Sequence, residues 1–449
     1  MRLWPLVLGG AALAVGMAFV LAPPHVKPPR PGEGANVLDA RPAYAGPMGK
    51  VNVAVFDDGA PLAGRHIVFQ DGAGAVVAEA TSGDDGKASA DAPAGGMVTV
   101  AYGNSVYQLI TVTGVQPGDD IVIGETEDEG GAARVVSTAR VKLPGAYPKA
   151  ARYTVSLGVG ATEVPRVADP LPLPVAKRFL VDEKKFRVLG EALDEKGAPA
   201  AYAFDWANLS TNAARRDVDV RLPAWSRTFR EFTLALSAPT EGLTAVEGQV
   251  SVLANERDRF ERPRQSASMA GPTPLRFLIP KALEGDTVYR LEFSYGASPD
   301  KAMLARSDKA LSDTTRIDLR EALLPRISLA TVEAGADVAR PTVRYRVAGD
   351  ASQADAAIVR LAWHDAREHL WTILAPPATP EIQLPQLPAS LKDWIPGRTP
   401  LSAAAALVEA SFYKGYDDIR HEGLTEFIED PESGEPRTWR YSATGDISF

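Results

Sequence analysis

Glycine and proline recur at short intervals along this chain, and their density is the feature that most limits what it can fold into. There are 38 glycines and 36 prolines among 449 residues, about a sixth of the chain, against a usual share of roughly an eighth. Both residues interrupt helices and favour turns. Between them lie short segments in which apolar and polar side chains alternate, as in half-buried strands. The chain is therefore predicted to be an all-β protein of many short strands.

Length and charge narrow the class of protein further. The length suggests about three domains of roughly 150 residues, or about four if each is a sandwich of roughly 100 residues. The 48 basic and 57 acidic residues give a formal net charge of −9. Nucleic-acid binding, which needs a basic surface to displace counterions, is therefore not expected.

The first 24 residues form an apolar segment. Residues 3–24 carry no charge and follow Arg2, which is typical of a secretory signal peptide or of an uncleaved membrane anchor. Val20 and Ala22 could precede a cleavage site, but Pro23 would then follow it, which is unfavourable. Both alternatives stay open. In either case we expect export to the cell envelope, whether membrane-anchored, periplasmic or at the cell surface, with membrane contact through this segment if it is retained.

A proline-rich spacer is expected over residues 25–47. Its first part, PPHVKPPRP at residues 23–31, favours an extended polyproline conformation. Such a spacer would hold the first folded domain away from the membrane.

The chain contains no cysteine. Disulfides, thiolate metal sites, cysteine nucleophiles and a lipoprotein anchor are therefore excluded. Domains of this size can bury an adequate core without disulfides.

Folding is predicted to start near Met48. Strands are expected at residues 51–56, 66–70, 76–81, 87–91, 98–102, 106–113 and 121–123, separated by glycine-containing turns. Together they would form a compact antiparallel sandwich over residues 48–125.

This region resembles the carboxypeptidase-regulatory-like domain, a prealbumin-type β-sandwich found in bacterial envelope proteins. The resemblance rests on Gly59-Ala60-Pro61 with Gly64, on Ala80-Thr81 leading to Gly86, and on Pro93 with Gly95. It covers about a sixth of the chain and implies an architecture and a surface setting without any chemistry. Some relatives carry a Lys–Asn isopeptide bond, for which Lys50 and Asn104 are the nearby residues, but the required buried acid is not evident.

Further sandwiches are expected downstream. Residues 126–134 lie in the acidic, glycine-containing run that begins ETEDEGG at residue 125, and they are predicted to be a linker. Strand patterns then continue through proposed β-sandwiches at 135–240 and 241–325 and a C-terminal β domain at 326–449. The fold class predicted for the whole chain is tandem Ig-like or prealbumin-like antiparallel β-sandwiches after the apolar segment.

Two segments allow more than one interpretation. Residues 402–410 are rich in alanine and could form a helix, but the alternation around Val408 and Ala410 favours a strand. Residues 257–264 (RDRFERPR) mix charges of both signs and are interpreted as a solvated loop.

Motifs that carry catalysis or bind metals are not found. None of the five histidines begins a zinc-protease motif, and the nucleophile elbow, the phosphate-binding loop and the dinucleotide fingerprint are missing. His364 and His369 enclose the polar run HDAREH, predicted to be a hairpin tip that faces water. Four acidic doublets, among them Asp119-Asp120 and Asp417-Asp418, are interpreted as turn residues rather than as calcium ligands. No catalytic residue, metal ligand or cofactor is therefore predicted.

The tryptophans provide the one tentative ligand contact. Trp394 lies in the irregular, proline-flanked segment LKDWIP and is expected to be the most exposed of them. We therefore predict a non-catalytic, exported or membrane-anchored envelope protein whose sandwiches serve as scaffold, spacer or protein-interaction surface. The alternative is a set of carbohydrate- or matrix-binding modules, which would need an exposed aromatic pair. A divergent hydrolase is the third reading.

Overall fold

The computed structural model describes residues 46–444, apart from 58, 103–106, 125–134, 159, 182–183, 210–216, 238–240, 254–258, 284, 309–312, 334–338, 366, 398 and 423–436. The apolar segment 1–24, nearly all of the spacer 25–47, the linker 126–134 and Asn104 lie outside these residues, so the predictions for them stay predictions. None of the helices in the described ranges is both long enough and apolar enough to cross a bilayer.

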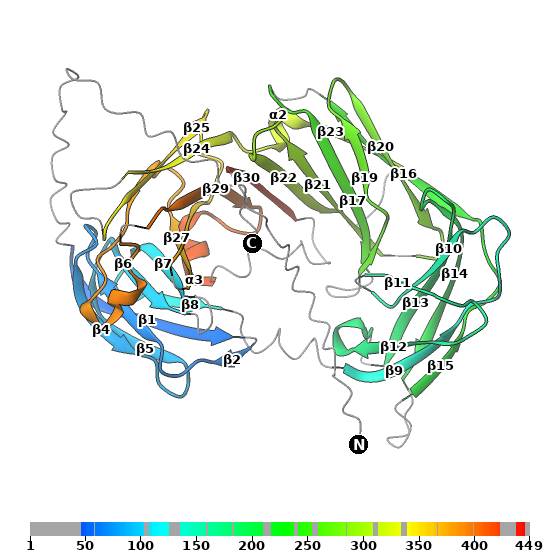
Figure 1. Ribbon diagram of the computed structural model, residues 1–449, viewed down its shortest axis with the longest axis horizontal. Helices are drawn as coiled ribbons and strands as arrows, with labels where there is room; N and C mark the ends of the chain where they lie inside the picture. Colours follow the sequence, from blue (N-terminus) through cyan, green and yellow to red (C-terminus); the bar gives the residue numbers. More distant parts are fainter. Residues whose placement is uncertain are drawn as a thin grey trace. The chain divides into compact units, whose positions relative to one another are not determined.

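The chain is mostly β-structure arranged in several sheets (Figure 1). The strands of the first sandwich are β1 (Met48–Asp57), β2 (Ala60–Pro61), β3 (His66–Gln70), β4 (Val76–Thr81), β5 (Lys87–Pro93), β6 (Gly96–Ala101), β7 (Tyr107–Val115) and β8 (Asp120–Ile123). The second group contains β9 (Val135–Lys142), β10 (Arg152–Ser156), β11 (Thr162–Glu163), β12 (Leu171–Ala176), the 3-10 helix η2 (Lys177–Phe179), β13 (Lys185–Leu193), β14 (Pro199–Asn208) and β15 (Asp217–Arg221).

The third group contains β16 (Phe229–Ser237), β17 (Ala245–Leu253), β18 (Arg259–Glu261), β19 (Gln265–Ser268), β20 (Thr273–Pro280), β21 (Asp286–Ser294), β22 (Lys301–Asp308) and β23 (Thr314–Asp318). The last group contains α2 (Leu319–Ala322), β24 (Arg326–Glu333), β25 (Thr342–Ala348), β26 (Ala356–His364), β27 (Glu368–Ala375), β28 (Glu381–Gln383), the 3-10 helix η3 (Ala389–Trp394), β29 (Ser402–Ala410), α3 (Tyr416–Glu422) and β30 (Thr438–Thr444).

The first three groups repeat one topological feature. In each, the first strand pairs in parallel with the last: β1 with β8, β9 with β15, and β16 with β23. The prediction of antiparallel sandwiches therefore holds for most pairs but not for these closing ones. Strand β16 was predicted to belong to the second sandwich, yet it pairs with β20 and β23. The domain boundaries themselves stay a prediction, and this pairing favours a boundary between β15 and β16.

The strands of the first sandwich lie close to their predicted positions. Val51, Val53 and Val55 of β1 are all buried, which is why this face of the strand packs into the core. Gly86 has φ +73°, and an added Cβ would lie 2.5 Å from the carbonyl oxygen of Val55. The glycine of this turn motif is thus required both by its backbone conformation and by the close approach of β1.

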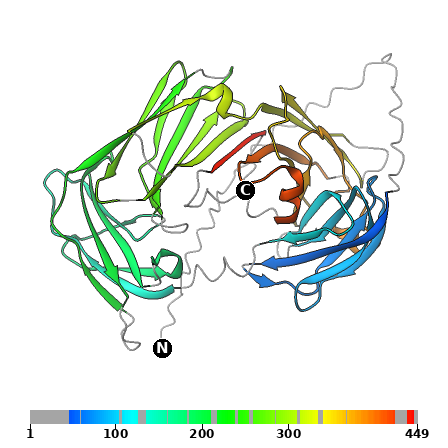
Figure 2. The same ribbon diagram turned by 180° about the vertical axis from the view of Figure 1, so that it is seen from behind.

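One 13-stranded sheet joins the first group to the last two. Its main path runs β18-β17-β21-β22-β30-β29-β26-β27-β7-β6-β3-β4, and β19 also pairs with β17. The first sandwich enters this sheet through the parallel pair of β7 with β27. In Figures 1 and 2 the cyan strand β7 and the orange C-terminal strands lie side by side. The sandwich predicted over residues 48–125 therefore shares a sheet with strands of the last group.

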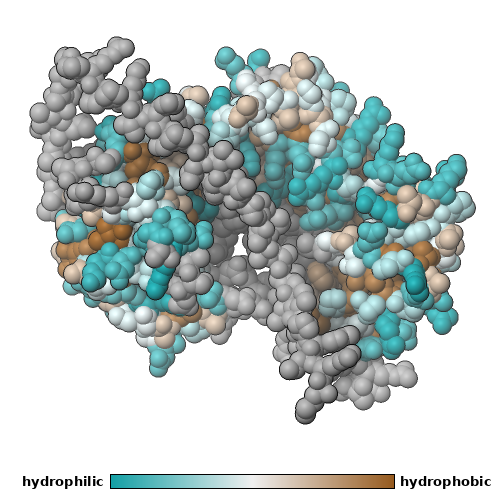
Figure 3. All heavy atoms as spheres, in the orientation of Figure 1, coloured by the Kyte–Doolittle hydropathy of each residue, from teal (hydrophilic) through white to brown (hydrophobic). Residues whose placement is uncertain are grey.

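The central strands of this sheet are buried on both faces. On β26, Ile358 belongs to the core shared with β1 and β8, whereas Val359 belongs to a second core shared with β24 and β25. On β29, Ala406 and Leu407 divide in the same way. Small alanines on β29 therefore fit a tightly enclosed strand, and the strand predicted at residues 402–410 is confirmed. On the face drawn in Figure 3, hydrophobic residues form small separate groups among hydrophilic ones.

Candidate functional site

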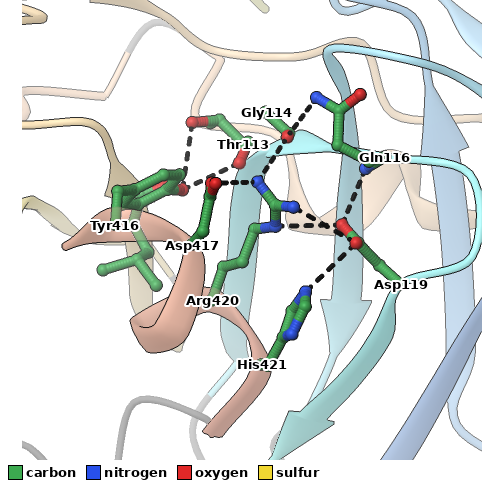
Figure 4. Close-up of polar contacts among 9 residues, drawn as sticks. Thr113, Gly114, Gln116, Asp119, Tyr416, Asp417, Arg420 and His421 are labelled. Carbon is green, nitrogen blue, oxygen red and sulfur yellow. Dashed lines mark hydrogen bonds and ion pairs between the residues drawn. The ribbon is translucent and has the colours of Figure 1, made fainter. Parts of the chain in front are cut away.

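Helix α3 fastens the C-terminal region to the first sandwich, and we call this contact the α3 clamp. It consists of Tyr416, Asp417, Arg420 and His421 on α3, of Thr113 and Gly114 on β7, and of Gln116 and Asp119 in the turn between β7 and β8 (Figure 4). Asp417 and Asp418 lie in the first turn of α3, where carboxylates interact favourably with the helix dipole. The Asp418 carboxylate also accepts a hydrogen bond from the backbone nitrogen of Lys414, at 2.8 Å.

Asp119 is the centre of the clamp. Its Oδ2 atom lies 3.0 Å from Arg420 Nε, and its Oδ1 atom accepts hydrogen bonds from Arg420 Nη2 at 3.2 Å and contacts His421 Nε2 at 3.1 Å. The backbone nitrogen of Gln116 donates to the same carboxylate at 2.7 Å. Asp119 and Arg420 are both buried. Each charge has lost its hydration, and the attraction of the opposite charge compensates for that loss.

Tyr416 covers the end of the β7–β27 pair. Its hydroxyl lies 2.8 Å from the carbonyl oxygen of Thr113 on β7 and 2.9 Å from that of Leu374 on β27. Burial raises the pKa of Tyr416, so the group stays a protonated donor for these carbonyls. One side chain therefore bridges the two strands where the first sandwich meets the last group.

A chain of buried polar side chains crosses the same pair of strands. The Gln70 amide contacts Thr99 Oγ1 at 3.1 Å, the Thr99 and Thr111 hydroxyls lie 2.8 Å apart, and Trp371 Nε1 donates to Thr111 Oγ1 at 2.8 Å. These residues are located on β3, β6, β7 and β27. A buried polar group needs a partner, so the bond from Trp371 to Thr111 favours the observed register between β7 and β27.

A second buried cluster lies between the second and third groups. Arg262 Nη2 donates to Glu191 Oε1 at 2.6 Å, and Arg262 Nε donates to the carbonyl oxygen of Leu278 at 2.9 Å. Nearby, the Arg187 guanidinium lies 4.6 Å from the centre of the Phe260 ring. The prediction of a solvated loop at residues 257–264 is therefore wrong at its C-terminal end, where Arg262 is 1% exposed.

Strand β13 explains how this second cluster forms. Eight of its nine residues are buried. Val188 faces the core of the second group, whereas Leu189 packs into the core of the third. Arg187, Leu189 and Glu191 are each two residues apart along β13, so their side chains lie on the same face of the strand, opposite that of Val188. The outer face of β13 is thus an interface and not a solvated surface.

The two histidines of the run HDAREH lie in different surroundings. His364 is exposed, but His369 is 1% exposed and stacks on Trp363 with ring centres 4.8 Å apart. His369 Nε2 lies 3.0 Å from Asp365 Oδ1. The expectation that both face water is therefore wrong for His369, because the hairpin turns between β26 and β27 before reaching it.

Trp394, the tentative ligand contact, is half-buried at the end of η3. Its ring lies 4.4 Å from that of Tyr107, which also contacts His369 at 5.0 Å. Trp206 is the most exposed of the described tryptophans, at 45%, whereas Trp363, Trp371 and Trp439 are buried. The expectation that Trp394 is the most exposed of them is therefore wrong. Whether Trp394 contacts a ligand stays a prediction.

The clamp and the Arg262 cluster could not have been found by local patterns. Asp119 and Arg420 are 301 positions apart, and Glu191 and Arg262 are 71 apart. The acidic doublets did mark Asp119 and Asp417, but as turn residues. The sequence of β13 carries three charged side chains, Lys185, Arg187 and Glu191, so it gives no local signal that both of its faces are buried.

The arrangement of these groups suits cohesion rather than bond chemistry. In the clamp the carboxylates of Asp119 and Asp417 both contact the Arg420 guanidinium, and Asp119 also contacts His421. Within the described ranges, no three His, Asp or Glu side chains gather in a group that could hold a metal ion. Asp355 is the one described carboxylate whose pKa is strongly raised, to about 6, chiefly by burial, and it accepts a hydrogen bond from the backbone of Ala410 at 2.9 Å.

Comparison with known proteins gives only distant likenesses. No family model matches this chain, and no curated protein does. Among solved structures, the Bacillus anthracis TIE protein is similar at 12% identity over 60% of this chain and 50% of its own, with a TM-score of 0.14. The shaft pilin SpaA of Lactobacillus rhamnosus GG is similar at 12% identity over 61% of this chain and 97% of its own, with a TM-score of 0.15.

The pilus adhesin SpaC of Lactobacillus rhamnosus GG is similar at 11% identity over 76% of this chain and 44% of its own, with a TM-score of 0.13. This chain thus spans half or less of the length of the TIE protein and of the adhesin. TM-scores this low do not establish a shared arrangement of strands.

Proposed function

We propose that this chain is an exported, envelope-anchored scaffold protein without catalytic activity, whose β-sandwiches present a surface to protein partners. The observation that carries the proposal is the parallel pairing of β7 with β27, which builds the first sandwich into one sheet with the last group. The α3 clamp and the Arg262 cluster add buried ion pairs at two junctions. A chain joined in this way can hold its surfaces at a fixed spacing, which is what a scaffold requires.

The envelope setting is supported by the sequence. The uncharged run at residues 3–24 and the proline-rich spacer after it are typical of an exported or anchored protein. The turn motifs around Gly59, Gly86 and Gly95 support a carboxypeptidase-regulatory-like identity for the first sandwich, and each of these glycines has a positive φ.

Localisation tests the proposal directly. The full chain would be expressed in a bacterial host beside a variant with Leu6→Arg and Leu13→Arg, which breaks the apolar run without altering the sandwiches. We expect the full chain in the membrane or periplasmic fraction, and the variant in the cytosol. Intact mass then separates the anchor from the cleaved signal. Recovery of both proteins in the cytosol would contradict an envelope role.

A further inference from the structure

A pocket of 510 Å³ opens beside the connection from the second group to the third. It is lined by Tyr147, Lys149, Pro199, Arg227 and Phe229, among others, and no carboxylate is among its lining residues. Its volume lies within the range of about 300–1,000 Å³ that is usual for small-ligand sites. Neither the sheet that joins the groups nor the α3 clamp uses this pocket.

The two cations of the pocket are exposed and make no ion pair with any described residue. Many other arginines of the described chain do pair with a carboxylate, as Arg230 does with Asp313 at 3.1 Å. Two cations at one pocket without a counter-charge create a positive potential there. An anionic group placed between them would therefore be attracted both by charge and by hydrogen bonds from two donors.

Lys149 is held in an unfavourable backbone conformation. Its φ is 73°, and it is the one non-glycine residue of the described chain with a positive φ. The backbone nitrogen of Ala150 donates to the Tyr147 carbonyl oxygen at 3.2 Å, so residues 147–150 form a turn with Pro148 second and Lys149 third. A positive φ at that third position is the mark of a type II turn, which strongly favours glycine there. Retaining a lysine where glycine would relieve strain points to a use for its side chain.

The walls of the pocket are fixed before any ligand arrives. On one side, two hydrogen bonds hold the wall in place. The backbone nitrogen of Tyr147 donates to the Tyr153 hydroxyl at 2.6 Å, and Trp225 Nε1 donates to the Gly145 carbonyl oxygen at 2.9 Å. On the other side the Phe229 ring packs against Tyr202 with ring centres 5.2 Å apart. A preformed site loses less conformational entropy on binding.

We propose that this pocket binds an anionic sugar, with the carboxylate of a uronic acid between Lys149 and Arg227. The apolar C–H face of the sugar ring packs on Tyr147, Phe229 and Pro199. A compact pocket with aromatic walls suits one or two sugar rings better than an extended acidic peptide. A peptide would need a row of backbone donors and acceptors, and Pro199 has no N–H to offer. The site is independent of the scaffold role.

The test is a titration of the full chain with trigalacturonate by calorimetry at low salt. Maltotriose serves as the neutral sugar and inorganic sulfate as the sugar-free anion. The variants are Lys149→Gln and Arg227→Gln, and the matched control is Lys185→Gln, an exposed lysine at the far end of β13. We expect saturable binding of trigalacturonate, weakened about tenfold or more by either pocket variant and unchanged in the control.

A third variant separates binding from folding. Lys149→Gly removes the side chain and relieves the positive φ, so its melting temperature should equal or exceed that of the parent while binding is lost. The proposal is overturned if trigalacturonate does not bind, if both glutamine variants bind like the parent, or if the control weakens binding equally. Equally tight binding of sulfate would also overturn it, because the negative charge alone would then be sufficient for binding. Equally tight binding of maltotriose would overturn it as well, because the sugar rings alone would then be sufficient.

Discussion

Single buried polar residues explain how neighbouring groups of strands keep one arrangement. Asp119 with Arg420, and Glu191 with Arg262, are ion pairs removed from water at two different junctions. The free energy needed to remove such charges from water is about as large as the free energy of their attraction, so these ion pairs contribute little net stability. Their effect lies in specificity, because any slipped arrangement would leave a buried charge without a partner.

His369 and His364 form a matched pair for testing burial. His369→Ala removes a ring that is packed against Trp363 and Tyr107, and we expect it to lower the free energy of unfolding by about 2–4 kcal/mol. His364→Ala, on an exposed side chain, should change it by no more than about 0.5 kcal/mol. Urea unfolding of the two variants measures both values, and equal small effects would show that His369 faces water after all.

Asp355 predicts a dependence of stability on pH. Burial raises its pKa to about 6 in the folded chain from an ordinary value of 3.8. The folded state therefore binds this proton more tightly than the unfolded state, and stability from this group is lost as the pH rises from about 4 through about 6. Asp355→Asn keeps an oxygen for the Ala410 nitrogen but cannot ionise. Its melting temperature relative to the parent should thus be higher at pH 7.5 than at pH 4.5, and a difference that does not vary with pH would refute this.

Among the elements, the short helix α3 contacts both β7 and β27 and so joins the first and last groups of strands. It is seven residues long, too short to be stable alone. Its order therefore depends on Ile419 and Tyr416 packing into the shared core and on Arg420 reaching Asp119. The helix in turn holds the end of β7 against β27.

Arg420→Leu tests that dependence. It leaves Asp119 buried without its cation, which should cost about 3–5 kcal/mol of unfolding free energy, and amide exchange should accelerate in α3 and at the ends of β7 and β27. Arg276→Leu is the control, since Arg276 is an exposed residue whose ion pair with Glu231 is 3.6 Å long. Slower exchange at α3, or equal effects of the two variants, would contradict the proposed role of the clamp.

The elements also show how far sequence patterns reach. Alternation placed β3 and β4 to the residue. It also identified β29 despite the helical propensity of its five alanines, because Val408 and Ala410 still alternate with the polar Glu409. Alternation does not indicate which strands pair with one another. Nothing local in residues 106–113 indicates that β7 pairs with a strand some 260 positions away. The same holds for the partners of Asp119 and Arg262, which depend on tertiary pairing.

At the scale of the whole molecule, the first and last groups of strands are not independent sandwiches, because they share one core. A core shared by β1, β8, β26 and β29 means that the first and last groups bury each other's side chains. The chain should then unfold these two groups together, since two-state behaviour follows from a shared core. The many non-local strand pairs also predict slow folding.

The most direct test of this central claim is a disulfide across β7 and β27. Gln108 and Leu370 are Cα partners in that pair, within the distance of about 7 Å that a disulfide can span, and the chain has no other cysteine. Gln108→Cys with Leu370→Cys should form an intramolecular disulfide nearly completely under mild oxidation, seen as a mobility shift that a reductant reverses. Gln108→Cys with Ser402→Cys is the control, because Ser402 lies on β29, three strands away from β7, and this pair should stay reduced. No crosslink in the first variant, or equal crosslinking in both, would contradict the joined sheet.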